Sequence, residues 1–574
     1  MNPTSPALTA AVLVAGTLAV ILLAHKLQLR LELSRAKHRS LAGHAKISRR
    51  LAALIPLYDY AAREFFRADC APAEVSARRQ AGFMHLANLF AERYPKTVQA
   101  TAEIHDTLSD LQFTARYRVP FQFSRMVRQH LQSGSVLESS NGPVTTDLDG
   151  NRHYDLTGSY GVNLFGHEFY KECIEQGSQR VCALGPVLGA YHPVVMHNLR
   201  RLREISGLEE VSFHMSGTEA VMQAVRPARY HTKRKCLVRF CGAYHGWWGD
   251  VQPGVGNPLA ARETYTLRDM DERSLRVLRR RRDIACVLVN PLQALHPNSN
   301  APGDSALIDS ARTAHFDRTA YTQWLQKLRA VCSARNIVLI FDEVFVGFRI
   351  APGGAQEYFG VRADMVTYGK TLGGGLPVGV LCGRAQLMRR FRPDRPADIC
   401  FARGTSNSHP YVMGVIYEFL QRLATAPIRA LYAGLDERWN TRARILNERL
   451  RAADLPVQVT NLSSIWTVSY LQPSRYNWMF QFYLRAEGLA LSWVGTGRLI
   501  FSLDYSDDAF AEVADRFVSA ASAMQAQGWW WADTRLTNRS IRARVLKEML
   551  RARRPPSAQS VPHATDATAL GDRA

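Results

Sequence analysis

The first strongly apolar stretch of the chain runs from Ala7 to Ala24, with the sequence ALTAAVLVAGTLAVILLA and no charged residue. As a helix it would be about 27 Å long, close to the roughly 30 Å thickness of the hydrocarbon core of a bilayer. No basic residue precedes this stretch and no small-x-small cleavage site follows it, which argues against a secretory signal peptide. A buried helix of a globular protein is the other alternative, but such helices usually keep a polar stripe. The pattern therefore predicts a transmembrane helix, with residues 1–25 as an anchor.

A basic and helical segment follows the predicted anchor. Between His25 and Arg50 the chain carries eight lysines and arginines and a single acid, Glu32. Because positive charge beside a membrane span stays cytoplasmic, we expect a single-pass membrane protein whose catalytic body is cytoplasmic. The same charges could lie on anionic headgroups or form a solvated helix face. Apolar residues at helical spacing extend the segment, so we predict a basic helical extension over 26–118, either a packing layer or a segment that admits substrate.

The pattern changes at Val144, where VTTDLDGNRHYDLTG alternates as two strands around the turn Asp149-Gly150 and predicts a β-hairpin. Short β-branched runs then alternate with helical stretches, a rhythm typical of an α/β domain with a mostly parallel sheet. We predict a large α/β domain over 119–413, a small α+β domain over 414–540 and a largely disordered tail over 541–574. The runs that predict the sheet are VSFHMSG, CLVRFCG, ACVLVNP, IVLIFDEV and MVTYGK, and those of the small domain are SIWTVSYL and RLIFSLDY.

Composition and charge narrow the functional class. Of 574 residues, 47% are hydrophobic and 21% are charged, which is typical of a globular protein. The formal net charge of +22 favours an anionic partner, either a membrane surface or nucleic acid. The arginine run 279–282 adds to this charge, but no nucleic-acid-binding motif accompanies it, and we expect it to coat an exposed helix. Nine cysteines without a CxxC pair argue against a disulfide scaffold or a cysteine-rich zinc site, so we expect a reducing compartment and no metal.

Two turns in the α/β region have candidate binding residues. In HMSGTEA a strand passes through Ser216, Gly217 and Thr218 into a helix, where backbone N–H groups and a hydroxyl can bind an anion. A Ser-Gly-Thr start can equally be an ordinary helix cap. In CGAYHG, Tyr244 lies between glycines at a strand end, where its ring could stack on a flat cofactor or pack in the core.

A carboxylate and a lysine complete the candidate chemistry. Asp342 ends the apolar run IFDEV, where a carboxylate is costly unless it pairs with a cation such as a protonated pyridine nitrogen, or caps the next helix. Lys370 follows the run MVTYG and precedes three glycines, so we expect the backbone there to approach another group closely. A desolvated lysine in a site can lose its proton and form an imine.

In this order, the four features resemble the class III pyridoxal-phosphate-dependent aminotransferases of fold type I, most closely their glutamate-1-semialdehyde 2,1-aminomutase-like branch. The resemblance covers roughly residues 119–528. It implies the fold type I architecture, pyridoxal 5'-phosphate as cofactor, and a homodimer. The motifs that carry it are DLTGSYGVNLFGH, MSGTEAVMQAVRPAR, GAYHG, IFDEVFVGFR, GGAQEYFGV, GKTLGGGLPVG and RGTSNSHP.

The resemblance also implies a role for each matching residue. Lys370 would hold the cofactor as an internal aldimine and move the proton of the substrate α-carbon, while Asp342 would keep the pyridine nitrogen protonated. The other implied contacts are the phosphate (Ser216, Gly217 and Thr218), the two ring faces (Tyr244 and Val344), the phosphate of the neighbouring subunit (Thr405) and the substrate entrance (Ser159 and Tyr160).

Departures from the family leave the substrate open. Relatives commonly have Glu-Pro where this chain has Asn290-Pro291, and the stretch 294–320 is expanded. The arginine that would hold a substrate carboxylate corresponds to Arg125 or Arg128, either of which could instead be a solvated helix residue. We therefore expect a membrane-anchored aminotransferase acting on an amine, aldehyde or keto substrate, lipid-like or membrane-delivered. The alternatives are an intramolecular aminomutase and a catalytically silent membrane scaffold.

Overall fold

A seven-stranded sheet forms the centre of the large domain in the computed structural model, which describes residues 6–38, 45–116, 119–252, 262–295, 314–491 and 497–552. Only β10 runs antiparallel to its neighbours, and the other pairs are parallel. The predicted mostly parallel sheet is therefore confirmed. In spatial order the strands are β4 (Glu210–His214), β10 (Gly379–Gly383), β9 (Met365–Gly369), β8 (Val338–Asp342), β7 (Ile284–Val289), β5 (Cys236–Phe240) and β6 (Thr264–Leu267).

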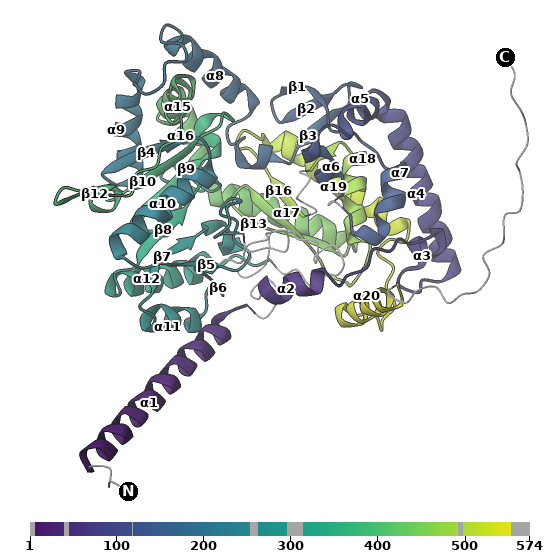
Figure 1. The fold of residues 1–574 in the computed structure, drawn as a ribbon. Helices are drawn as coiled ribbons and strands as arrows, with labels where there is room; N and C mark the ends of the chain where they lie inside the picture. Colours follow the sequence, from purple (N-terminus) through teal and green to yellow (C-terminus); the bar gives the residue numbers. More distant parts are fainter. Residues whose placement is uncertain are drawn as a thin grey trace, which may run out of the picture.

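The five strands from β10 to β5 are buried at every residue, as expected for a sheet with both faces covered by helices. Figure 1 shows these helices around the sheet in the left half of the molecule. Strand β10 is missing from the prediction because its sequence, GVLCG, is short and bounded by glycine. The surrounding elements are α8 (His167–Val181), α9 (Val194–Ser206), α10 (Gly217–Thr232), α11 (Glu272–Arg280), α12 (Arg318–Ala334), α13 (Gly354–Phe359), α14 (Ala385–Met388), α15 (Pro410–Leu423), β11 (Phe391–Arg392) and β12 (Arg395–Ile399).

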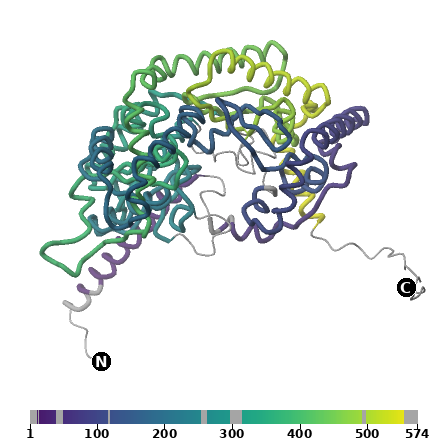
Figure 2. Tube along the Cα trace, turned by 90° about the horizontal axis from the view of Figure 1, so that it is seen from above, coloured from purple at the N-terminus to yellow at the C-terminus, as the bar shows by residue number. Residues whose placement is uncertain are grey.

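The other half of the molecule combines both ends of the chain. Figures 1 and 2 show the blue and purple N-terminal helices beside the yellow C-terminal helices, and α4 contacts both α3 and α18. The predicted hairpin is present as β2 and β3. The elements are α2 (Ala45–Ala52), α3 (Ala62–Arg67), α4 (Ala73–Arg93), α5 (Pro95–His105), α6 (Ser109–Arg116), α7 (Ser124–His130), β1 (Leu137–Asn141), β2 (Val144–Asp147), β3 (Arg152–Asp155), α17 (Leu435–Ala452), β13 (Val457–Leu462), β14 (Ile465–Tyr470), α18 (Phe480–Ala486), β15 (Leu489–Ala490), β16 (Arg498–Ile500), α19 (Asp507–Ala526) and α20 (Asn538–Ala552). Helix α16 (Ala426–Tyr432) lies beside α15 in the left half of Figure 1.

A buried arginine joins the two ends of the chain. Arg475 is 1% exposed, its Nε lies 3.2 Å from Asp69 Oδ1, and its Nη1 lies 3.0 Å from Glu548 Oε1. Glu548 belongs to α20, which also buries Ile541 and Val545. The prediction of a tail that is largely disordered from residue 541 is therefore wrong over 541–552, because α20 contributes an apolar face and an ion pair to the fold. Residues 553–574 lie outside the described part of the chain.

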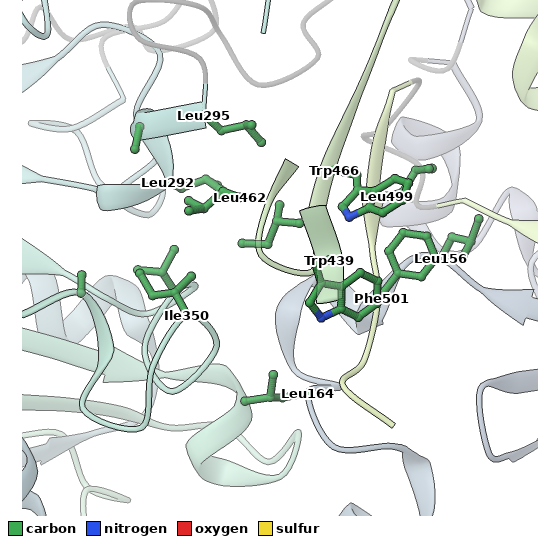
Figure 3. Close-up of a cluster of buried hydrophobic side chains, with 14 of the residues drawn as sticks. Leu156, Leu164, Leu292, Leu295, Ile350, Trp439, Leu462, Trp466, Leu499 and Phe501 are labelled. Atoms are coloured by element: carbon green, nitrogen blue, oxygen red, sulfur yellow. The ribbon is translucent and has the colours of Figure 1, made fainter. Parts of the chain in front are cut away.

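An apolar seam connects the two halves of the molecule (Figure 3). Side chains that follow β7 and β8 in the large domain meet side chains of α17, β13, β14 and β16. Burying each large apolar side chain stabilises the fold by roughly 1.5–3 kcal/mol. Residues drawn in this seam include Leu156, Leu164, Leu292, Leu295, Ile350, Trp439, Leu462, Trp466, Leu499 and Phe501.

Helix α1 (Pro6–Ala36) extends away from the rest of the molecule in Figure 1. Its stretch Leu13–Ala36 has a mean hydropathy of 1.4 and is long and apolar enough to cross a membrane, criteria that a signal sequence near an N-terminus also meets. The helix does not end near residue 25 but continues to Ala36, where it contacts α11. All nine cysteines are free.

Candidate active site

Lys370 begins a 3₁₀ turn (Lys370–Gly373) directly after β9. Its backbone has a φ of 47°, and this left-handed conformation turns the chain sharply at the strand end. Its Nζ donates a hydrogen bond to the Tyr160 carbonyl oxygen at 2.6 Å and lies 4.4 Å from the centre of the Phe345 ring. Burial lowers the pKa of Lys370 from 10.5 to about 7; the Asp342 charge opposes this shift and the Arg498 and Arg349 charges add to it. The amine is therefore poised to be neutral near physiological pH.

Asp342 lies on the neighbouring strand, and hydrogen bonds fix both of its carboxylate oxygens. His245 Nδ1 donates to Oδ2 at 2.7 Å, while the Val344 N–H (3.2 Å) and Thr367 Oγ1 (3.3 Å) donate to Oδ1. Burial lowers the pKa of His245, so the imidazole is neutral and its Nδ1 proton faces the carboxylate. Asp342 is itself only 4% exposed. A buried carboxylate held in this way is suited to pair with a cationic ring nitrogen.

The predicted anion-binding turn lies at the start of α10. Ser216 caps this helix, with its Oγ accepting from the Glu219 N–H at 3.2 Å, so that the first-turn N–H groups of Gly217 and Thr218 have no partner within the helix. A Cβ atom at Gly217 would lie 2.7 Å from Val344 Cγ1. Only glycine permits this close approach, which brings the turn against the segment that follows Asp342.

The turn also lies against the strand that carries the lysine. A Cβ atom at Gly369 would lie 3.3 Å from Val344 Cγ1 and 3.9 Å from the Gly217 Cα. The helix start, Val344 and the residue before Lys370 are thus in mutual contact. An amine, a carboxylate and an anion-binding turn around one point are the groups that a phosphorylated pyridine aldehyde requires, so the residues present fit this cofactor.

Tyr244 lies on the loop after β5, and its side chain is 60% exposed. Partial burial raises the pKa of Tyr244, and the Asp342 charge adds to this rise. The Asn290 side chain donates to the Tyr244 carbonyl oxygen at 3.0 Å. The residue at which this chain departs from Glu-Pro therefore supports the tyrosine loop.

The predicted entrance residues Ser159 and Tyr160 lie in a 3₁₀ turn (Gly158–Gly161), both with positive φ (45° and 57°). The fully buried Arg349 holds this turn through hydrogen bonds to the carbonyl oxygens of Gly161 (3.4 Å) and Asn163 (2.8 Å). It also donates to the Phe501 carbonyl oxygen at 2.7 Å, in the C-terminal part of the chain. The entrance turn is thus fixed to both halves of the molecule, and Tyr160 meets Lys370 directly.

Three predicted residues are not brought to Lys370 within this chain. Thr405 is exposed on the segment after β12, which Asn407 connects to His214 at 3.5 Å. Arg125 and Arg128 are exposed on α7, which packs against α4 in the right half of Figure 1, whereas β9, the strand that precedes Lys370, lies in the left half. Most of the expanded stretch 294–320, namely residues 296–313, lies outside the described part of the chain.

Four contributors near Lys370 are missing from the prediction: His245, Phe345, Arg349 and Arg498. His245 lies in the motif GAYHG, and Phe345 and Arg349 lie in IFDEVFVGFR. The polar residues of these motifs, His245 and Arg349, could therefore have been predicted as site residues from the sequence. Arg498 is on β16 and lies 6.0 Å from the Phe345 ring centre. No local pattern marks it, because only the packing of the small domain brings it to the site.

Three features of the site define a fold type I pyridoxal-phosphate enzyme. They are a lysine that follows β9, a carboxylate at the end of the neighbouring strand β8, and the start of a helix beside both. The structural relatives are of this kind. A transaminase with pyridoxal phosphate bound has a TM-score of 0.60 and 25% identity, covering 75% of this chain and 99% of its own. A glutamate-1-semialdehyde aminomutase from Pseudomonas aeruginosa PAO1 has a TM-score of 0.61 at 18% identity, covering 78% and 99%, and shares the fold.

The chain belongs to the class III aminotransferases, because the family model "Aminotransferase class-III" matches residues 126–250 and 315–521. Among curated proteins, the glutamate-1-semialdehyde 2,1-aminomutase of Alkaliphilus oremlandii is 34% identical over 319 residues, 50% of this chain and 70% of the relative. That of Citrifermentans bemidjiense is 30% identical over 383 residues, 63% and 83%. The protein is thus a class III aminotransferase or aminomutase, and its cofactor is pyridoxal 5'-phosphate.

Proposed function

We propose that this protein is a membrane-anchored aminotransferase that moves an amino group to or from an aldehyde or keto substrate. The observation that carries the proposal is the position of the Lys370 amine, which follows β9 beside Asp342 on β8 and the start of α10. Burial lowers the pKa of this amine to about 7, which suits proton uptake and release near neutral pH. Bound pyridoxal phosphate supplies an electron sink for negative charge at the substrate α-carbon. Lys370 would hold the cofactor, and its amine would take up and return the proton at the substrate α-carbon.

The remaining residues bind and orient. Ser216, Gly217 and Thr218 bind the cofactor phosphate, and Asp342 holds a proton at the pyridine nitrogen while His245 fixes the carboxylate.

Tyr244 and Val344 enclose the ring, and Ser159 and Tyr160 line the entrance. Arg498, beside Phe345, supplies positive charge for an anionic group of the substrate.

Transfer between two molecules is the first candidate; Arg125 and Arg128, the arginines at the position of the family's carboxylate-binding residue, are exposed on α7, which packs against α4. The aminomutase reaction is the second candidate, and the names of the curated relatives favour it. Incubating the enzyme with an amino donor and no acceptor separates the two reactions. A lasting pyridoxamine-type absorbance with release of keto product supports aminotransfer; a spectrum that returns to its start while the donor is isomerised contradicts it. The Lys370→Ala variant is the control and should show neither result.

We propose a homodimer as the working form. Large apolar side chains are exposed on the large domain, and a second copy would bury them. Sedimentation of the holoenzyme should give twice the chain mass, and a monomer with full activity would contradict the proposal. The exposed side chains are Val187, Leu188, Tyr191, Met196, Trp247, Ile399 and Phe401.

We propose that α1 anchors the enzyme in the membrane with the catalytic body on the cytoplasmic side. The support is the exposure of every residue over 13–24, and a helix that continues without a break into contacts with α11. Deleting residues 1–24 should release the enzyme from sedimented vesicles while activity is kept. Continued tight association of the truncated enzyme would contradict anchoring by α1.

A further inference from the structure

The end of α1 is locked onto the large domain. Leu29 and Leu33 are half-buried and Ala36 is fully buried, a spacing that places all three on one helix face against α11. The Arg268 N–H donates to the Ala36 carbonyl oxygen at 3.0 Å, and its guanidinium donates to the Arg35 carbonyl oxygen at 2.9 Å. These contacts fix the direction of the apolar helix relative to the catalytic body.

A cavity lies at this junction, lined by His25, Gln28 and Leu29 of α1 and by Arg280 and Arg282 at the end of α11. His25 is the first residue after the apolar stretch that ends at Ala24. Leu29 lies five residues beyond Ala24, a rise of about 8 Å along the helix. The polar headgroup layer occupies roughly 5–8 Å on each side of the hydrocarbon core. With α1 in a bilayer, the cavity would therefore lie at the depth of the headgroups.

The basic side chains at the cavity favour an anionic ligand. Arg280 pairs with Glu32, the acid of α1 that faces it, whereas Arg282 is exposed beside it. Further exposed basic residues of both helices surround the junction. A planar guanidinium matches the geometry of a phosphate, and a glutamine and a histidine add hydrogen-bonding groups. These surrounding basic residues are Lys26, Arg30, Arg273, Arg276 and Arg279.

We propose that this cavity binds the headgroup phosphate of an anionic phospholipid, an inference that rests on the proposed anchoring by α1. Arg282 and Arg280 contact the phosphate, Gln28 and His25 contact the polar headgroup, and Leu29 contacts the start of the acyl chains. The site orients the catalytic body on the membrane, because the lipid bridges the anchor and the large domain. It is separate from the cofactor phosphate site at the start of α10.

The test uses the full chain in detergent, with native mass spectrometry in the presence of phosphatidylglycerol or phosphatidylcholine of matched acyl chains. We expect retained phosphatidylglycerol on the wild type and little retained phosphatidylcholine. Arg282→Gln should weaken retention about five-fold, the contribution of one basic residue at an anionic surface. Arg280→Lys, which keeps the charge beside Glu32, should weaken it without releasing α1. Arg451→Gln, an exposed arginine on α17, is the matched control and should change nothing.

Results that contradict the lipid site can be told apart from results that contradict anchoring by α1. Equal retention of the two lipids, unchanged retention in Arg282→Gln, or displacement of the lipid by millimolar inorganic phosphate would overturn the lipid site. If vesicle association persists in those cases, anchoring by α1 stands and only the headgroup site is wrong. A wild-type protein that fails to associate even with phosphatidylcholine vesicles would overturn both. The cofactor spectrum reports the enzymatic proposal separately from either result.

Discussion

The strongest test of the site is the pH dependence with which the apoenzyme captures pyridoxal phosphate. Only a neutral amine attacks the aldehyde, so the rate follows the deprotonated fraction of Lys370. Because burial lowers its pKa from 10.5 to about 7, the difference is about 3.5 pH units. At pH 7 about half of the Lys370 amine is neutral, compared with about 0.03% of an ordinary lysine, an advantage of roughly three orders of magnitude.

The two neighbouring charges allow a second prediction, about the direction in which variants shift the pKa of Lys370. The Asp342 carboxylate raises the pKa of Lys370, so Asp342→Asn should move the midpoint of the profile to lower pH. The Arg498 charge lowers that pKa, so Arg498→Gln should move the midpoint to higher pH. The two variants should therefore shift in opposite directions.

The assay follows cofactor absorbance after mixing apoenzyme with pyridoxal phosphate between pH 5.5 and 9.5. Dividing each rate by that of N-acetyl-lysine amide removes the titration of the cofactor itself. The normalised rate constant should fall with rising pH above about 7, because the model amine gains neutral form and the buried one has reached its plateau. A ratio independent of pH, or variants that shift in the same direction, would refute the assignment of a desolvated amine balanced by these charges.

Three further substitutions test the supports of the site and of the fold. His245→Phe removes a hydrogen bond to the Asp342 carboxylate worth about 1.5–3 kcal/mol, so kcat should fall roughly ten-fold to a hundred-fold while cofactor remains bound; an unchanged kcat would argue against a positioning role. Arg349→Met leaves buried carbonyl oxygens without a donor and should cost about 3–5 kcal/mol in urea unfolding, and a loss below about 1 kcal/mol would contradict this. Glu548→Gln should cost about 1–3 kcal/mol because it leaves buried Arg475 with one fewer carboxylate, whereas the exposed control Glu448→Gln should cost under about 0.5 kcal/mol; equal losses would be the contrary result.

Local patterns were sufficient for much of the fold and for the centre of the site. Five strands and the hairpin could be predicted because each is a short run with a clear period or a continuous apolar sequence. Lys370 and Asp342 could be singled out because a charged residue at the end of an apolar strand is unusual. The structure places these two residues on adjacent strands, which the order of the runs along the chain does not reveal.

What the sequence could not reveal depends on contacts between distant segments. Arg498 reaches the site only because β16 packs beside the loop that carries Phe345, and nothing in RLIFSLDY distinguishes it from a solvated arginine. The length of α1 was underestimated for the same reason. Residues 26–36 read as a charged segment, but Leu29, Leu33 and Ala36 form a narrow apolar face whose partner, α11, lies far along the chain.

The excess of positive charge also needs a structural interpretation. Arg79, Arg349 and Arg475 are among the largest fully buried side chains, and each binds carbonyl or carboxylate oxygens from distant segments. Such arginines contribute to the net charge of +22 but offer nothing to a ligand at the surface. The exposed basic residues that α1 and α11 bring together are a different group, because their positions follow the end of an apolar helix. The evidence for an anionic partner is therefore the position of these exposed basic residues beside the apolar helix, and not the net charge of the whole chain.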